Sequence, residues 1–220
     1  MIADAETVLF LPGLGAGTDT WDLQLRALPA GFTGLATEIS GLDQAATPGA
    51  FTFAAATLAL RDLLDERGVE RAHVCGLSLG GMTATHFALD FPERVASLVL
   101  SGSQVRPHPA LTASVRTGVR MLPESIAESR GLTKAMWLGA LGVIADVNFR
   151  GRLTSIQAPT LVLCGSRDVI NIPAARELAA TIPNAELRII PRAGHPWNQQ
   201  HPELFSRTIA EFYARLARGG

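Results

Sequence analysis

The chain has 220 residues, a length suited to one α/β domain, and 47% of them are apolar, which excludes a disordered chain. Its 19 Lys and Arg against 20 Asp and Glu leave a net charge of −1, so no charge excess predicts binding to nucleic acid or to a membrane surface. Two cysteines exclude a disulfide framework, and no Cys/His cluster predicts a zinc site.

The sequence does not predict a targeting signal. Residues 1–6 carry acids and lack the basic start of a secretory signal. The longest stretch without Asp, Glu, Lys, Arg or His, residues 44–60, is too short to span a membrane. We therefore expect a cytoplasmic protein that forms a single domain over residues 1–220 and uses no cofactor.

Short apolar runs alternate with helical patterns along most of the chain. Strands are expected at residues 7–12, 32–39, 71–77, 95–100, 159–164 and 186–190. Helices are expected at residues 51–67, 78–91, 173–182 and 202–216. Strands without in–out alternation, separated by helices, are typical of a mostly parallel sheet covered on both faces.

One segment, residues 105–157, interrupts this alternation. It contains helical pieces at residues 111–122, 126–129 and 132–144 and no convincing strand. We expect a small helical cap beside the carboxyl ends of the strands, where open α/β sheets bind ligands. Its apolar residues are candidates for lining an acyl pocket, although their helical spacing is more typical of core packing: Met121, Met136, Trp137, Leu138 and Leu141.

The most informative motif is Gly76-Leu77-Ser78-Leu79-Gly80-Gly81. The pattern G-x-S-x-G is a modest signal, with about 0.1 chance matches expected at this composition. Here, however, a buried strand leads into Ser78 and a helix leaves it, as a nucleophile elbow requires. Glycines at 76 and 80 would let strand and helix approach closely and hold the Ser78 hydroxyl out of the sheet. The alternative is a serine that caps an ordinary helix.

A serine nucleophile needs a base, and the base needs an acid that orients it. Of five histidines, His195 alone lies in a loop after a predicted strand, at the same sheet edge as Ser78. The others lie in a strand, in a helix, in the insertion and at the start of the last helix: His73, His86, His108 and His201.

Asp168 directly follows the strand at residues 159–164 and is the expected acid. Its nearest competitor, Asp146, lies in the insertion, and the alternative role for Asp168 is to cap a turn. The glycine-rich turn at residues 12–15 ends the first strand at this edge. Its Leu14 N–H is expected to form an oxyanion hole with the N–H of Leu79.

The order Ser78, Asp168, His195 resembles that of the α/β-hydrolase superfamily, over nearly the whole chain. The sequence CGLSLGGM resembles the elbow of its small esterases and 3-oxoadipate enol-lactonases. Three further segments resemble parts of that family. LPGL with the later Trp21 is similar to its oxyanion segment, FPERV to its link into the next strand, and AGHPWNQQHPELF to its histidine loop. The resemblance implies the α/β-hydrolase fold, here with a shortened N-terminus, about six strands and a reduced cap.

These residues predict a serine hydrolase that cleaves a carboxylic ester, lactone or thioester of a small molecule through an acyl-enzyme on Ser78. A serine at the elbow favours acyl transfer over the alkyl-ester chemistry of family members with a carboxylate there. The alternatives are a C–C bond hydrolase or a cofactor-free perhydrolase on the same triad, or a non-catalytic receptor of small molecules. A homodimer is compatible with the apolar surface that a short hairpin and cap would expose.

Overall fold

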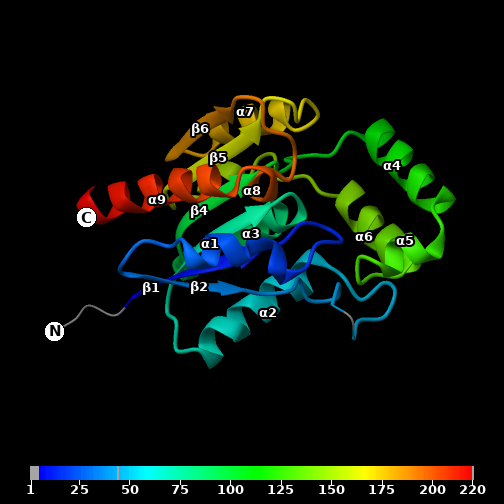
Figure 1. Cartoon of the computed structure of the whole chain (residues 1–220), viewed down its shortest axis with the longest axis horizontal. Coiled ribbons are helices and arrows are strands. Elements are labelled where there is room, and N and C mark those ends of the chain that lie inside the picture. The colour runs from blue at the N-terminus through cyan, green and yellow to red at the C-terminus, as the bar shows by residue number, and fades with distance from the viewer. Residues whose placement is uncertain (1–4, 44, 220) are drawn as a thin grey trace.

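The computed structural model describes residues 5–43 and 45–219 (Figure 1). The expectations for residues 1–4 and for Gln44 therefore lie outside the described residues. Six strands form one sheet in the order β2-β1-β3-β4-β5-β6, and every neighbouring pair is parallel. Their bounds are β1 Glu6–Leu11, β2 Phe32–Ala36, β3 Ala72–Leu77, β4 Val95–Ser101, β5 Thr160–Gly165 and β6 Ala185–Ile190. The predicted α/β class and the number of strands are confirmed.

Helices cover both faces of the sheet (Figure 1). One face packs against α2 Phe53–Glu66, α3 Leu79–Asp90 and α7 Ile172–Thr181. The other packs against α1 Asp22–Arg26, α8 Trp197–Gln200 and α9 Pro202–Gly219. The short helices α1 and α8 and the 3₁₀ turns η1 Thr18–Trp21, η2 Pro92–Arg94 and η3 Leu153–Ser155 were not predicted. They are too short to show a helical period.

The two cores follow from the pleat of the strands. In β1, Leu9 and Leu11 face the first helix layer, whereas Val8 and Phe10 face the second. Both faces are apolar because both are covered, which explains the lack of alternation in the sequence. All four side chains are fully buried.

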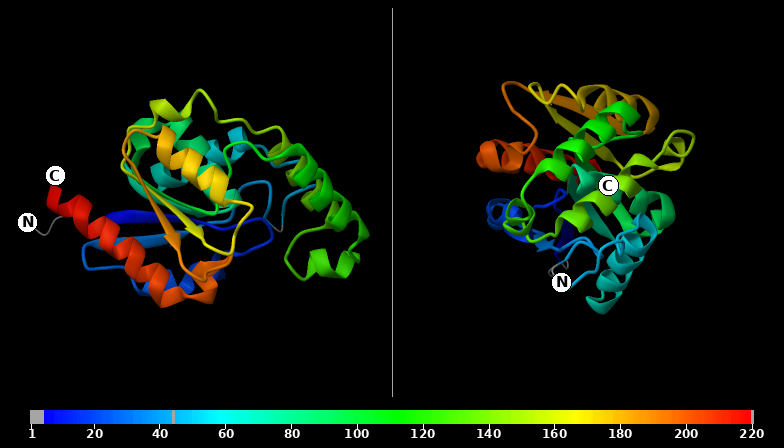
Figure 2. Two further views of the ribbon diagram at one scale, coloured as in Figure 1. Left: turned by 90° about the horizontal axis from the view of Figure 1, so that it is seen from above. Right: turned by 90° about the vertical axis from the view of Figure 1, so that its right-hand side faces the viewer.

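The segment between β4 and β5 forms α4 Pro109–Met121, α5 Glu124–Glu128 and α6 Lys134–Ala145. Figure 2 shows these helices as a group that stands beyond the carboxyl ends of the strands. Met136 and Leu141 are buried there, but Met121 is 82% exposed, so its expected place in a core or pocket lining was wrong. Within the described part of the chain, no helix has the length and apolar character needed to cross a membrane.

Candidate active site

Ser78 occupies a strained turn between β3 and α3. Its φ of 56° and ψ of −114° are unfavourable for a residue with a side chain. A Cβ at Gly76 would overlap the backbone of Gly80, and a Cβ at Gly80 would overlap the backbone of Leu11. Both glycines are therefore required by the close packing of strand and helix, as the motif predicts. The Ser78 side chain makes no capping hydrogen bond to α3, so the capping alternative finds no support.

The carboxylate of Asp168 and the ring of His195 meet at the carboxyl edge of the sheet. Asp168 follows β5, His195 lies in the loop after β6, and His195 Nδ1 lies 2.6 Å from Asp168 Oδ2. The Asp168 side chain is 7% exposed and the His195 side chain 38%. A buried carboxylate accepts a hydrogen bond from the Nδ1–H, which leaves the other ring nitrogen, Nε2, unprotonated in the neutral ring.

The end of β4 and the turn after it contact both Ser78 and His195. The Ser78 N–H donates to the carbonyl of Ser101 at 2.8 Å, and Gly102 lies directly against the His195 ring. Within residues 5–43 and 45–219, His195 Nε2 has no hydrogen-bond partner, the Ser78 hydroxyl included. Catalytic hydrogen bonds are often long without substrate and shorten in the complex, so the pair remains compatible with proton transfer.

In the described part of the chain, none of the other histidines forms a hydrogen bond with the Asp168 carboxylate. His73 is buried in β3 between Ser97 and Glu6, and burial lowers its pKa despite the opposing effect of the Glu6 carboxylate. His86 pairs with Asp90 on α3, and His108 caps α4. His201 is exposed at the start of α9. The competing acid Asp146 is exposed at the end of α6.

The two backbone N–H groups that we expect to form an oxyanion hole belong to segments that adjoin Ser78. A Cβ at Gly13 would lie 3.6 Å from the Ser78 Cβ, so the turn after β1 touches the elbow. Leu79 is the first residue of α3, and its N–H has no acceptor within the helix. In the described part of the chain, the N–H of Leu14 also lacks a protein acceptor.

Two further polar residues, which the sequence did not reveal, belong to the site. Asn171 Nδ2 lies 2.8 and 2.9 Å from the two carboxylate oxygens of Asp168. Gln104 Nε2 lies 2.5 Å from Asn171 Oδ1. Their only signal in the sequence is that each follows a strand at the carboxyl edge, a position they share with many loop residues.

The Cys164 thiol lies beside Asp168, with its Sγ 3.7 Å from the Asp168 carbonyl oxygen. Burial, with a smaller effect of the Asp168 carboxylate, raises the pKa of Cys164 to about 12. This thiol is therefore protonated at neutral pH and is a poor nucleophile. Among residues 5–43 and 45–219, no group of three or more His, Cys, Asp or Glu is arranged to hold a metal ion.

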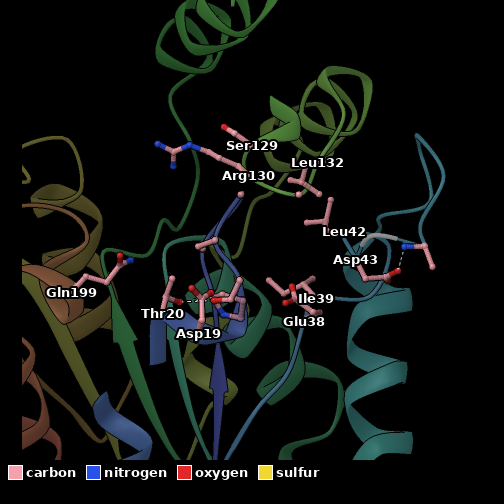
Figure 3. A pocket seen from close by; sticks show the side chains of 17 residues that line it. Asp19, Thr20, Glu38, Ile39, Leu42, Asp43, Ser129, Arg130, Leu132 and Gln199 are labelled. Carbon is pink, nitrogen blue, oxygen red and sulfur yellow. Dashed lines mark hydrogen bonds between the residues drawn. The ribbon is translucent and has the colours of Figure 1, made fainter. Parts of the chain in front are cut away.

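A cleft of about 730 Å³ opens beside the elbow (Figure 3). The cleft is lined by Gly13, where an added Cβ would lie 3.6 Å from the Ser78 Cβ, and by Gln199 of α8, the helix that follows the His195 loop. Ser78 and His195 themselves are not among its described lining residues. Its floor is the turn after β1 and its roof is the loop between α5 and α6, as Figure 3 shows. Four charged residues line it, three acidic and one basic: Asp19, Glu38, Asp43 and Arg130.

The comparison with known proteins decides the family. Residues 6–128 match the family model described as alpha/beta hydrolase fold. The chain belongs to the α/β hydrolase fold family. Its elbow, acid and histidine lie at the ends of β3, β5 and β6, in the order that the resemblance implied.

Similar proteins cover nearly the whole chain. A 2-hydroxy-6-oxononadienedioate/2-hydroxy-6-oxononatrienedioate hydrolase of Paraburkholderia xenovorans is 30% identical, over 96% of this chain and 87% of the relative. A Variovorax paradoxus protein named as the carbamate hydrolase RutD is 27% identical, over 99% and 95%. The structure of a thermophilic esterase from Thermogutta terrifontis superposes with a TM-score of 0.82 at 25% identity, over 96% and 90%. These relatives support hydrolase activity but differ in the bond that they cleave.

Proposed function

We propose that this protein is a serine hydrolase that cleaves a carboxylic ester, or a lactone or thioester, of a small molecule. The observation that carries the proposal is the Asp168–His195 pair, which lies at the same sheet edge as the strained Ser78. Asp168 is buried and holds Nδ1 of the ring, so Nε2 is directed to act as the base. A solvated histidine would lack the buried carboxylate at Nδ1, and a serine that only capped a helix would not need the strained turn.

The first half of the reaction forms the acyl-enzyme. His195 Nε2 takes the proton of the Ser78 hydroxyl while Oγ bonds to the substrate carbonyl carbon. The carbonyl oxygen becomes an oxyanion that accepts hydrogen bonds from the N–H groups of Leu14 and Leu79. Asp168 stabilises the imidazolium ion until His195 gives its proton to the leaving alcohol or thiol, and the bond to that group breaks.

The second half returns the enzyme to its starting state. Nε2 of His195 takes a proton from water, whose oxygen attacks the acyl-enzyme carbonyl. The same two N–H groups hold the second oxyanion. Its collapse breaks the bond to Ser78 Oγ, which regains a proton from His195, and the carboxylic acid leaves.

The cleft supports an ester over the dienedioates named for the C–C hydrolase relatives. Those substrates carry two carboxylates, and Asp19, Glu38 and Asp43 would repel them, with only Arg130 as an opposing charge. C–C bond hydrolysis is nevertheless the second candidate, because the 30% identical relative is named as a hydrolase of such dienedioates. Product analysis with a neutral ester and a dienedioate distinguishes the two candidates.

The proposal is tested with a fluorophosphonate and intact-mass spectrometry. We expect one covalent adduct on the wild type and none on Ser78→Ala, which should also lose turnover of p-nitrophenyl acetate. Ser155→Ala is the matched control, because Ser155 is exposed outside the cleft and forms only a local hydrogen bond to the Arg152 carbonyl. Absence of an adduct on active wild-type protein, or full activity of Ser78→Ala, would exclude Ser78 as the nucleophile.

A further inference from the structure

Asp168 is a buried carboxylate with few partners. Among residues 5–43 and 45–219, no arginine or lysine forms an ion pair with it. An ionised carboxylate out of water is costly unless hydrogen bonds replace the lost solvent. The groups that supply them here are the Nδ1–H of His195 and the side-chain amide of Asn171.

The Asn171 amide lies across both carboxylate oxygens of Asp168. Nδ2 lies 2.8 Å from Oδ1 and 2.9 Å from Oδ2, and it also lies 3.1 Å from His195 Nδ1. Asn171 is the N-cap residue of α7, yet its side chain makes no capping hydrogen bond to that helix. Asparagine is favoured at that position for capping, so its side chain is committed to Asp168 instead.

Gln104 holds the other end of this amide. Because an ionised carboxylate only accepts hydrogen bonds, Asn171 must present its NH₂ group to Asp168 and its oxygen to Gln104. Gln104 Nε2 donates to that oxygen at 2.5 Å. Gln104 follows β4 and Asn171 follows β5, so the contact ties together the ends of two neighbouring strands.

We propose that Asn171, held by Gln104, is a positioning residue that keeps the Asp168 carboxylate directed at His195 Nδ1. The inference rests on the proposed function for its effect on turnover. If the carboxylate rotated away from the ring, it would no longer hold the proton on Nδ1, and the tautomer in which Nε2 acts as the base would lose its stabilisation. Asn171 blocks that rotation by engaging both oxygens, and Gln104 prevents the amide from turning its own oxygen toward the carboxylate.

The test compares Asn171→Leu, which keeps the volume and removes the amide, with Asn184→Leu. Asn184 is an exposed amide just before β6, at the opposite sheet edge. We expect Asn171→Leu to lose about tenfold or more in kcat on p-nitrophenyl acetate with KM nearly unchanged. The low-field NMR signal of the His195 Nδ1 proton should shift or broaden. Asn184→Leu should change neither measurement.

A second variant, Gln104→Met, gives an independent measurement if Asn171→Leu does not fold. On its own it should show a smaller loss of kcat and a shifted or broadened signal of the His195 Nδ1 proton, and a wild-type kcat and signal would contradict the inference. Where Asn171→Leu does fold, adding Gln104→Met to it should cost nothing further, because the contact it removes is then already absent. Additive losses in the double variant would contradict the coupling of the two residues.

The outcomes separate this inference from the proposed function. A folded Asn171→Leu protein with the wild-type NMR signal overturns the inference, whatever its activity, and so does a loss confined to KM. A changed signal with full activity, or a wild type without esterase activity, instead contradicts the proposed role of His195. In those two cases the change of the signal still supports the position assigned to Asn171.

Discussion

Gly102 lies directly against the imidazole of His195: a Cβ at Gly102 would be 2.8 Å from Cε1 and 2.9 Å from Nδ1 of the ring. The same Cβ would lie 3.2 Å from Asp168 Oδ2, so it would push against both members of the pair. The turn that ends β4 thus contributes the empty space that His195 and Asp168 need to meet.

Gly102→Ala should therefore reduce activity by displacing the ring. A misplacement of about 1 Å can cost about 100-fold in rate, so we expect a loss of that order in kcat. Gly151→Ala is the control, because Gly151 also has a positive φ but has no atoms within 4 Å of the added Cβ. It should lose about 1 kcal/mol of unfolding free energy and keep full activity. Equal kcat values for the two variants would contradict this account.

Gly80→Ala should prevent correct folding of the elbow. The new Cβ would overlap the carbonyl oxygen of Leu11 and lie 2.7 Å from that of Pro12, and backbone cannot yield as a flexible side chain can. Gly118→Ala, in the exposed part of α4, meets no atom within 4 Å and should stabilise that helix by up to about 1 kcal/mol. Soluble yield and thermal unfolding measure both effects. A stable, fully active Gly80→Ala protein would refute the packing described for the elbow.

Substrate charge should affect turnover because three carboxylates line the cleft against one guanidinium. We expect a choline ester to have a higher kcat/KM than its neutral 3,3-dimethylbutyl isostere, with the ratio falling as salt is added. Glu38→Gln should reduce the ratio a few-fold at most, since the charge is exposed. Glu203→Gln, on α9 and outside the cleft, should leave it unchanged. A preference for anionic esters would contradict the binding of substrate in this cleft.

Folding stability should fall in mild acid because burial lowers the pKa of His73 below 6.5. Between the folded pKa and 6.5 the unfolded chain binds a proton that the folded protein does not. The contribution of neutral His73 to the free energy of unfolding is therefore complete above pH 6.5. It is lost as the pH falls toward the folded pKa, with a slope of at most about 1.4 kcal/mol per pH unit. His73→Gln should flatten this part of the curve of unfolding free energy against pH. An equally steep curve for the variant would assign the effect to other groups.

Cys164 should resist alkylation despite its place beside Asp168. With its pKa raised to about 12, the thiol stays protonated at pH 8, and it is fully buried. Iodoacetamide at pH 8 should leave folded protein unmodified and active, while denatured protein should gain label on Cys75 and Cys164. Rapid labelling of Cys164 in the folded state would show that this part of the site opens to solvent.

The local sequence determined the layers of the fold and the three principal side chains of the candidate site. Apolar runs such as that of β3 and helical periods such as that of α2 depend on neighbours in sequence, so they could be read directly. The elbow glycines carry their own steric signal. Asp168 and His195 could be placed because each follows a strand, and the ends of parallel strands share one edge.

Only the tertiary structure decided what surrounds these residues. Gln104, Asn171 and the space over Gly102 acquire a role because β4 and β5 are neighbours in the sheet, and no local pattern encodes that contact. The cleft likewise joins Asp19 and Glu38 with Arg130, which lies about 110 and 90 residues further along the chain, in the loop between α5 and α6. Hydrogen bonds and cavities of this kind depend on distances between segments remote in sequence, and folding alone sets those distances.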